Sequence, residues 1–565
     1  MTNTKIFNPP GPGAWELETT HWSRPVTRFV QEAMLNGFVK GFASGAARYG
    51  SMLNHLEPAF VNDFTYMRAV GFGAPPNAVA PPPKLVMQIL TRVVPKMRKR
   101  IQTAHDAMTN KIWRHDLEQW DKQVKPAAII KHRKLQSVDF SSLDDAGLIA
   151  HIRDAHAHMG DMIEQHHQFT ITVGVPVGDF LAHVHDWTGK PTGEILQALR
   201  GSSKISLGIA QEELAKLAAA INANPAARSM LASSDSAQSV IDGLLALEGI
   251  TKPMNDYLDL VWVRCFGYDL GAKSMGEMPE LLVRSIRAGV DGSGLQRDDA
   301  ASAQARIASL RQAVAAEHHA TFDALLEEAL LINRLRDERG NYSDGWSAGI
   351  ARRALLEAGR RLVKRGTFTS VESACEASLE EIIALLNGQA GPSEAELQAR
   401  TSWRATKTTA DEDIPDWLGA PPSPPPPTEW LPVKGRRMDR AVSMFITTLF
   451  HEPEAKTTAT TVNGLPVSPG IYEGIARLVN DEADFGHIQR GDVLVARNTS
   501  PYFNVILPLL GAIVTDRGGQ LCHAAIVSRE YGIPGVVGTR EASNLIRDGA
   551  RVRVNGTTGE VTVLS

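Results

Sequence analysis

Cysteine is scarce in this 565-residue sequence: Cys265, Cys375 and Cys522 are the only three, and long stretches separate them. They form neither a CxxC pair nor the dense, even-numbered set that marks a disulfide scaffold. The sequence also lacks a run of about 18 or more apolar residues, the length that a membrane-spanning helix needs. Its N-terminus has no basic region followed by an apolar core, so we expect no signal peptide. These absences predict a cytoplasmic protein that does not bind a membrane.

An excess of charge of one sign is missing as well. The 59 Lys and Arg residues nearly balance the 63 Asp and Glu residues, and the formal net charge is -4. This balance gives no reason to expect nucleic acid as a partner. We also find no P-loop, and no Gly-rich loop followed by the acidic metal ligands that a Mg·ATP site needs. The chain is therefore not expected to bind ATP by itself, and no metal site is predicted.

What is present divides the chain into three parts. Apolar residues at three- and four-residue spacing, as in Gln211 to Ala223, predict helices over most of residues 1–411. A proline cluster between Glu412 and Val433 favours polyproline II, and predicts a semi-rigid linker with one short helix over residues 412–459. From about Thr460, short β-like runs alternate with Gly-rich turns. We therefore expect a multidomain protein, with a mostly α-helical N-terminal domain and an α/β domain over residues 460–565.

One histidine of the α/β domain is placed for chemistry. A helical interval from His523 to Tyr531 follows the pair Gly518 and Gly519, which allow a tight turn or the close approach of a ligand. The N-terminus of a helix offers N–H groups and a partial positive charge to a phosphate. A neutral imidazole at that place is a competent nucleophile near pH 7. Taken alone, a GGxxxH pattern is more typical of a packed or capping histidine.

The surrounding segments change that interpretation. Gly464 to Val479, Gly491 to Phe503 and Thr515 to Thr539 resemble, in this order, the phosphohistidine swivelling domain of the PEP-utilising enzyme superfamily. The superfamily includes pyruvate phosphate dikinase, PEP synthase and rifampin phosphotransferase. The resemblance implies that His523 carries a phosphoryl group and that Gly518 and Gly519 bind phosphate. Many members have Thr-Ser before the histidine where this chain has Leu521-Cys522, so regulation through that threonine is not expected.

The N-terminal part carries a second resemblance. Gly11 to Phe29 and Arg336 to Gly366, and more loosely Tyr257 to Leu282, are similar to the substrate domain of rifampin-phosphotransferase-like and phenylphosphate-synthase-type proteins. The loose match has Gly267-Tyr268-Asp269 where its counterpart usually has Gly-x-Arg. On a helix from Trp346, the cations Arg353, Arg360 and Lys364 share one stripe that is suited to a transferring phosphoryl group. The alternative is a solvated basic face.

Histidines in the helical part are candidates for the base that takes a proton from an acceptor hydroxyl. His156 and His167 share a helical face, and His21 is a further candidate. For any single one, a packing or surface role is an equal alternative.

Together these features predict a phosphotransferase subunit. The resemblance implies that a separate ATP-grasp subunit binds ATP and Mg²⁺, and places the β-phosphoryl group on His523. His523 then phosphorylates a small phenolic substrate, phenol or p-cresol, bound by the domain of residues 1–411. Two alternatives are a component of a rifampin-type antibiotic phosphotransferase and a non-enzymatic phosphocarrier.

Overall fold

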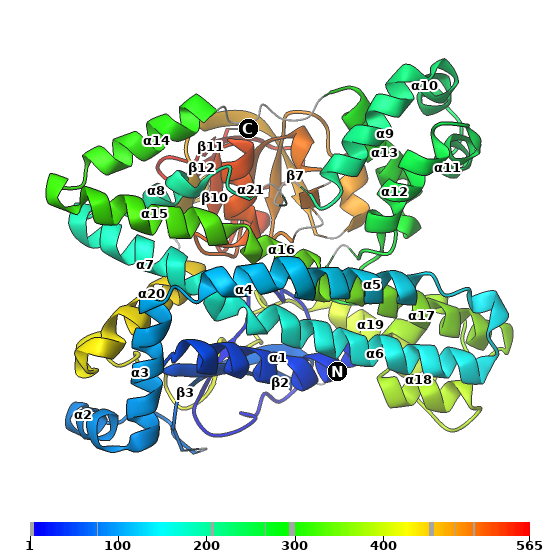
Figure 1. The fold of residues 1–565 in the computed structure, drawn as a ribbon. Coiled ribbons are helices and arrows are strands. Elements are labelled where there is room, and N and C mark those ends of the chain that lie inside the picture. Colours follow the sequence, from blue (N-terminus) through cyan, green and yellow to red (C-terminus); the bar gives the residue numbers. More distant parts are fainter. Residues whose placement is uncertain are drawn as a thin grey trace. The chain divides into compact units, whose positions relative to one another are not determined.

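The computed structural model describes residues 5–75, 77–203, 205, 208–265, 267–292, 300–450, 457–480, 482–500, 503–504 and 506–564. These residues form two compact units (Figure 1). Unit 1 contains residues 1–187, 269–271 and 317–447, and unit 2 contains residues 188–268, 272–316 and 448–565. This division differs from the predicted segments, because helices between residues 188 and 316 belong to the unit of the C-terminal sheet. No helix in the described part of the chain has the length and hydropathy needed to span a membrane.

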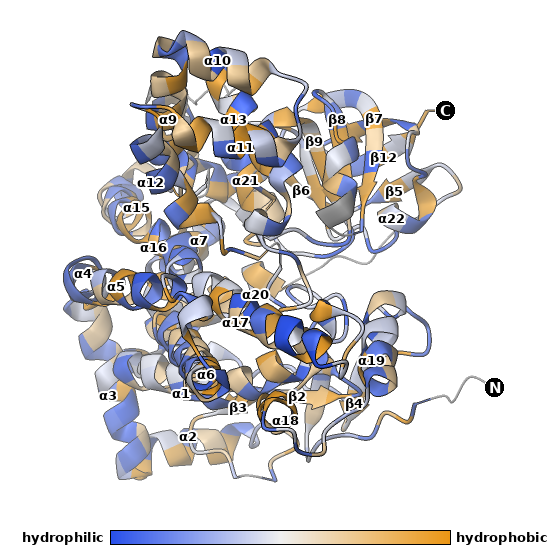
Figure 2. Cartoon of the chain, turned by 90° about the vertical axis from the view of Figure 1, so that its right-hand side faces the viewer, coloured by the Kyte–Doolittle hydropathy of each residue, from blue (hydrophilic) through white to orange (hydrophobic). Residues whose placement is uncertain are grey.

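Unit 1 is built mainly of helices. They are α1 (Arg28–Tyr49), α2 (Lys84–Val93), α3 (Pro95–Thr109), α4 (Trp113–Gln119), α5 (Lys125–Gln136), α6 (Asp145–Gln168), α7 (Thr170–Thr188), α15 (His319–Asn333), α16 (Leu335–Asn341), α17 (Asp344–Lys364), α18 (Leu379–Leu386), α19 (Glu394–Thr406) and α20 (Val433–Phe450). The short helix predicted after the proline cluster is α20. Helix α6 carries both apolar and polar residues, as its mixed hydropathy colours show (Figure 2).

Helices α1 and α6 lie side by side (Figure 1), and glycines on α1 allow the close contact. Gly37, Gly41 and Gly45 recur every fourth residue, so they lie on one face of the helix. A Cβ atom on Gly41 would lie 2.1 Å from the carbonyl oxygen of Glu164. Any larger side chain would therefore push the two helices apart, and this contact fixes where the last turn of α6 lies.

Unit 1 also contains a small antiparallel sheet that the sequence did not predict. Its strand order is β2-β3-β1-β4, with β1 at Ala14–Leu17, β2 at Leu53–Val61, β3 at Phe64–Gly71 and β4 at Trp417–Gly419. Asn62 and Asp63 join β2 to β3 with φ of 51° and 71°, the backbone of a type I′ hairpin turn. The central strand β1 pairs with β4, which comes from about 400 residues further along the chain.

Strand β4 lies within residues 412–459, which were predicted to form a linker, and this part of the prediction is wrong. Ile414 and Leu418 lie in the proline-rich segment and are 5% and 6% exposed, in one apolar cluster with Trp15. Helix α20 packs on α7, where Gly178 leaves room for Ala441 and Phe445. Residues 414–419 and 433–447 are therefore integrated into unit 1 instead of forming a free spacer. Residues 451–456 of the predicted linker lie outside the described residues.

Unit 2 combines helices with the C-terminal sheet. The helices are α8 (Thr192–Ile195), α9 (Gln211–Ala223), α10 (Pro225–Ala232), α11 (Ala237–Ala246), α12 (Thr251–Val261), α13 (Pro279–Val290), α14 (Ala300–Gln312), α21 (His523–Tyr531) and α22 (Ala542–Leu545). The strands are β5 (Thr461–Asn463), β6 (Leu465–Ser468), β7 (Ile471–Val479), β8 (Asp492–Ala496), β9 (Leu510–Thr515), β10 (Gly535–Val537), β11 (Arg551–Asn555) and β12 (Glu560–Val563). The predicted fold class, helical with a C-terminal α/β domain, is confirmed.

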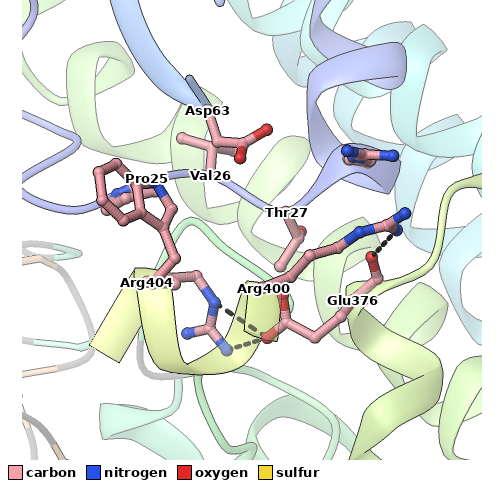
Figure 3. A pocket seen from close by; sticks show the side chains of 9 residues that line it. Pro25, Val26, Thr27, Asp63, Glu376, Arg400 and Arg404 are labelled. Carbon is pink, nitrogen blue, oxygen red and sulfur yellow. Dashed lines mark hydrogen bonds and ion pairs between the residues drawn. The ribbon is translucent and has the colours of Figure 1, made fainter. Parts of the chain in front are cut away.

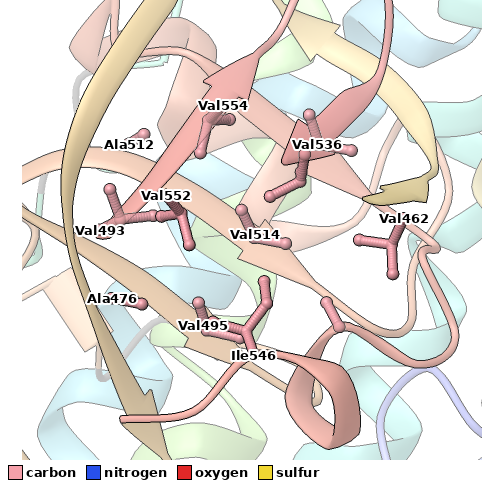
Figure 4. Packing of buried hydrophobic residues seen from close by; sticks show 12 residues of the cluster. Val462, Ala476, Val493, Val495, Ala512, Val514, Val536, Ile546, Val552 and Val554 are labelled. Carbon is pink, nitrogen blue, oxygen red and sulfur yellow. The ribbon is translucent and has the colours of Figure 1, made fainter. Parts of the chain in front are cut away.

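The C-terminal sheet has the strand order β5-β12-β11-β7-β8-β9-β10-β6. Its inner strands β7, β8, β9 and β10 run parallel to one another, so their carboxyl ends lie at one edge, whereas β11 and β6 pair antiparallel with β7 and β10. Val493, Val495, Ala512 and Val514 of the inner strands are fully buried in its core (Figure 4). Ligand sites of such sheets form where the loops leave the carboxyl ends of the strands.

Candidate active site

His523 begins helix α21 directly after the loop that leaves β9. Gly518 in this loop has a φ of 120°, a conformation that glycine adopts easily, and a Cβ there would lie 2.6 Å from Cys522 Sγ. A Cβ on Gly519 would lie 2.5 Å from the carbonyl oxygen of Leu449. Both glycines are therefore required by the path of the backbone. Their predicted role in phosphate binding stays a prediction.

Cys522 caps helix α21, which begins with His523. Its Sγ accepts a hydrogen bond from the N–H of Ala525 at 3.5 Å, and the side chain is 9% exposed. This is the role that serine commonly has at the N-terminus of a helix. Cys522, which stands where many relatives have serine, thus still caps the helix. Its sulfur is a weaker hydrogen-bond acceptor than a serine oxygen.

Two side chains from the loop after β8 hold the imidazole of His523. Thr499 Oγ1 lies 2.9 Å from Nδ1, and Asn504 Oδ1 lies 3.2 Å from Nε2. Thr499 and Asn504 are each 9% exposed, whereas His523 is only half-buried. Both ring nitrogens thus contact buried neighbours, while the ring itself stays partly exposed. Sequence reasoning named neither residue, although Thr499 lies in the matching segment from Gly491 to Phe503.

Asp516 stabilises the turn between β9 and α21. This carboxylate is 3% exposed and accepts hydrogen bonds from the N–H of Ser543 at 2.9 Å and from the Ser543 hydroxyl. Burial raises the pKa of Asp516 above its ordinary value, and the bonds to Ser543 oppose that effect. The contacts tie the histidine loop to α22.

The predicted basic stripe lies on α17 in unit 1. Arg353 donates to the carbonyl oxygens of Gln136 at 3.0 Å and Val138 at 2.8 Å, and its guanidinium lies 4.2 Å from the centroid of the Phe140 ring. Arg360 pairs with Glu357 at 3.0 Å, and Lys364 is exposed. These contacts give Arg353 a structural role, and the part of the stripe in phosphate binding stays a prediction.

The three predicted base candidates have different surroundings. His156 is 7% exposed and packs edge-on against the Phe29 ring at 4.6 Å, with Nε2 3.8 Å from Glu32. His21 and His167, in contrast, share one cluster of unit 1 with residues that the sequence did not single out.

That histidine cluster consists of Glu18, His21, His166, His167, Arg339 and Asp344. His21 Nδ1 lies 3.0 Å from Glu18 Oε1, and His166 Nδ1 lies 2.8 Å from Asp344 Oδ1. The rings of His166 and His167 have their centroids 4.6 Å apart. Arg339 donates to the carbonyl oxygen of His166 at 3.0 Å, and its charge acts on all three imidazoles.

The pKa values in the cluster are pushed in opposite directions. Desolvation opposes the charge of His21, but the Glu18 carboxylate outweighs it and raises the pKa of His21. Burial lowers the pKa of His166, aided by Arg339 and His21 and opposed by Asp344. Burial also holds the pKa of His167 well below its usual range. His21 thus keeps its proton to a higher pH than an ordinary imidazole, because its pKa is raised, and His166 loses its proton at a lower pH, because its pKa is lowered.

A separate pocket of unit 1 lies at the start of α1 (Figure 3). Three arginines line it, but carboxylates balance their charge. Arg400 forms two bonds with Glu381, at 2.6 and 2.8 Å, and Arg404 pairs with Glu376, with Nε 3.1 Å from Oε1. Arg28 lies 3.3 Å from Glu381 as well. The pocket therefore has little surplus positive charge for a phosphate.

Comparison with known proteins matches residues 488–559 to the mobile domain of PEP-utilising enzymes. An uncharacterized phosphotransferase of Bacillus subtilis is 42% identical over 112 residues, which are 20% of this chain and 14% of that protein. A rifampicin phosphotransferase of Streptomyces sviceus is 44% identical over 102 residues, 18% and 12% of the two chains. A probable phosphoenolpyruvate synthase of Archaeoglobus fulgidus is 37% identical over 161 residues, 27% and 21% of the two chains. The chain thus spans less than a quarter of the length of these relatives.

Proposed function

Because this chain carries a mobile domain of the PEP-utilising enzyme family, we propose that it is the phosphohistidine component of a two-protein phosphotransferase. A single observation carries the proposal: His523 lies in the matched domain, at the N-terminus of α21, with its two ring nitrogens next to Thr499 and Asn504. The relatives named above as phosphotransferases support the same class of reaction.

In the first half-reaction His523 receives a phosphoryl group. With the Nδ1 proton donated to Thr499 Oγ1, Nε2 keeps the lone pair that attacks phosphorus, and the Asn504 amide oxygen, which lies 3.2 Å from Nε2, moves aside as the phosphoryl group arrives. ATP on the separate ATP-grasp subunit supplies the β-phosphoryl group and, with one water, leaves as AMP and phosphate. Mg²⁺ bound with ATP belongs to that subunit. The N-terminus of α21 stabilises the negative charge of the phosphoryl group.

In the second half-reaction the group passes to a phenolic hydroxyl. The P–Nε2 bond breaks as the P–O bond forms, and His523 leaves as a neutral imidazole that keeps its proton at Nδ1. A covalent intermediate divides one difficult transfer into two steps. Phenol or p-cresol is the acceptor that the resemblance of the N-terminal segments implies.

The test supplies the chain with an ATP-grasp protein and ATP labelled at the β-phosphorus. The expected product is an acid-labile, alkali-stable label on the chain that is absent from His523→Ala. A matched control is His487→Gln, because His487 is an exposed histidine of the same domain. Adding p-cresol should release labelled aryl phosphate.

Other outcomes separate the alternatives. Discharge by rifampin but not by p-cresol would assign the chain to the antibiotic phosphotransferases. A stable label that no hydroxyl compound removes would make it a phosphocarrier. Labelling that persists in His523→Ala would refute the proposal.

A further inference from the structure

We propose that the histidine cluster of unit 1 is the site where the acceptor hydroxyl gives up its proton, with His166 as the base and His21 as the cation that binds the transferred group. This inference rests on the proposed function and deepens it, because it assigns the acceptor site to named residues.

The first argument is the arrangement of the two imidazoles. Each has Nδ1 next to a carboxylate, so proton transfer to a substrate takes place at Nε2. The His21 side chain is 41% exposed and that of His166 is 16% exposed, so both are accessible to a small molecule. Their support is more deeply buried: the side chain of Glu18 is 5% exposed, and Arg339 is 8% exposed.

The second argument is that each support is fixed by the backbone. Glu18 accepts hydrogen bonds from the N–H groups of Thr20, His21 and Trp22, at distances between 3.0 and 3.2 Å. Arg339 donates to the carbonyl oxygen of His166, near the end of α6, where carbonyl groups have no partner within the helix. Glu18, Arg339 and Asp344 are thus positioning residues, and they hold the imidazoles without side-chain rearrangement.

The third argument is electrostatic. The charged and titratable groups that act on His21 are Glu18 and Asp344 on one side and Arg339 on the other, and those that act on His166 are Asp344, Arg339 and His21. Burial lowers the pKa of His166 against the effect of Asp344, and, against desolvation, Glu18 raises the pKa of His21, so the two pKa values diverge. Neighbouring groups whose pKa values diverge in this way commonly divide the roles of acid and base between them.

The proposed step balances as follows. The acceptor oxygen attacks phosphorus while its proton moves to Nε2 of His166, and the P–N bond to His523 breaks. His21, as the imidazolium, donates a hydrogen bond to a phosphoryl oxygen and offsets its charge. His166 later returns its proton to solvent.

The same chemistry selects the class of acceptor. A phenolic O–H has a pKa near 10, as in tyrosine, which is closer to that of an imidazole than an aliphatic hydroxyl is. Proton transfer to a base is most effective when the two pKa values are close. Aromatic alcohols are therefore the expected substrates. The ring of His167 packs against Phe38, with centroids 3.9 Å apart and the ring planes tilted by 45°.

The test follows transfer from the isolated, labelled phospho-protein to p-cresol in a single turnover. His166→Asn should slow the release of aryl phosphate by about 100-fold or more, the range of general base catalysis. His21→Gln should slow it about tenfold to 100-fold, as the loss of one charged donor does. Labelling of His523 should be unchanged in both variants. His105→Gln, an exposed histidine on α3, is the matched control.

A positioning role for Asp344 has its own readout. Asp344→Asn should change the pH profile of the transfer step more than its affinity for p-cresol, and Asp344→Glu should restore part of the rate. Wild-type transfer in His166→Asn would overturn the inference and leave the phosphohistidine intact.

If no phosphohistidine forms in the wild type, the proposed function fails. The acceptor site is then tested separately, by the binding of p-cresol and inorganic phosphate. The NMR signals of the His21 and His166 rings should then still shift when p-cresol and inorganic phosphate are added. The signal of the control residue His105 should not shift. No shift at His21 and His166 would refute the acceptor site as well.

Discussion

Replacing Thr499 with valine tests whether the orientation of His523 limits its phosphorylation. The change removes the hydroxyl that lies 2.9 Å from Nδ1 in a position that is 9% exposed. Valine keeps nearly the same shape, so the side chain still fills its place but offers no hydrogen bond. Nδ1 then loses its fixed proton acceptor, and the ring can adopt the tautomer that has no lone pair at Nε2.

The expected loss of rate follows from the positive charge that the imidazole of His523 gains as Nε2 attacks phosphorus, because the hydrogen bond to Thr499 stabilises that charge. A hydrogen bond to a charged group contributes about 1.5 to 3 kcal/mol, and about 1.4 kcal/mol in a barrier changes a rate tenfold. Thr499→Val should therefore slow phosphorylation of His523 by about tenfold to 100-fold. Thr499→Ser keeps the hydroxyl and should recover most of the rate.

Rapid-quench labelling with the ATP-grasp partner measures this rate directly. Thr558→Val serves as the control, because Thr558 is exposed in the same domain. A Thr499→Val protein that is labelled at the wild-type rate would refute the idea that Thr499 fixes the tautomer. Loss of the rate in Thr499→Ser as well would indicate a packing defect instead.

Four further outcomes are expected. Gly519→Ala should abolish labelling, because its Cβ would lie 2.5 Å from the backbone oxygen of Leu449, while circular dichroism should still show a folded sheet. Cys522→Ser should keep the labelling and raise the unfolding temperature, since oxygen is a better helix cap than sulfur. Glu328→Gln should lower the free energy of unfolding by about 1.5 to 3 kcal/mol in urea titrations, because Glu328 is buried and hydrogen-bonded to Lys111 and Arg114, whose charges are partly exposed. The pKa of Glu328 is lowered to about 2, so its contribution is present above about pH 4.5 and is lost as the pH falls toward 2. The rate of transfer to p-cresol should be bell-shaped in pH: it rises as His166, with its lowered pKa, loses its proton below pH 6.5, and falls as His21, with its raised pKa, loses its proton above that value.

Much of the C-terminal domain could be predicted because its signals are local. Helix α21 has the predicted bounds, His523 to Tyr531, and each predicted β-like run became a strand. Glycine turns and alternating apolar residues act over a few positions, and the tertiary structure agrees with them. In the N-terminal part, helix α9 also has the predicted bounds, Gln211 to Ala223.

The sheet of unit 1 could not be predicted in the same way. Strands β1 and β4 are short and pair across about 400 residues, so neither segment carries a strong pattern of its own. Only the turn at Asn62-Asp63 offered a local signal, since this pair of residues tolerates positive φ in a two-residue hairpin.

The histidine cluster shows a similar limit. His21 and His167 were predicted as candidates, but His166 and its carboxylate Asp344 were not, because 178 residues separate that pair. The spacing of Glu18 and His21 was visible in the sequence, yet a carboxylate three residues before a histidine is too common to identify a dyad. Helix periodicity placed His156 and His167 on one face of the helix. In the structure the two residues nevertheless have different neighbours: Phe29 and Glu32 for His156, and His166 for His167.

The proline-rich segment bears on how the proposed phosphohistidine would reach two sites. A carrier that serves a separate nucleotide subunit and an acceptor site needs a connection that permits motion. Residues 414–419 do not provide it, because β4 is hydrogen-bonded into the sheet of unit 1 and Leu418 is 6% exposed. Helix α20 is likewise held on α7 by the close approach of Gly178 to Ala441. The polyproline residues between β4 and α20 therefore act as a strut inside unit 1. Shortening this strut should alter the stability of unit 1, and should leave the labelling of His523 by the proposed ATP-grasp partner unchanged.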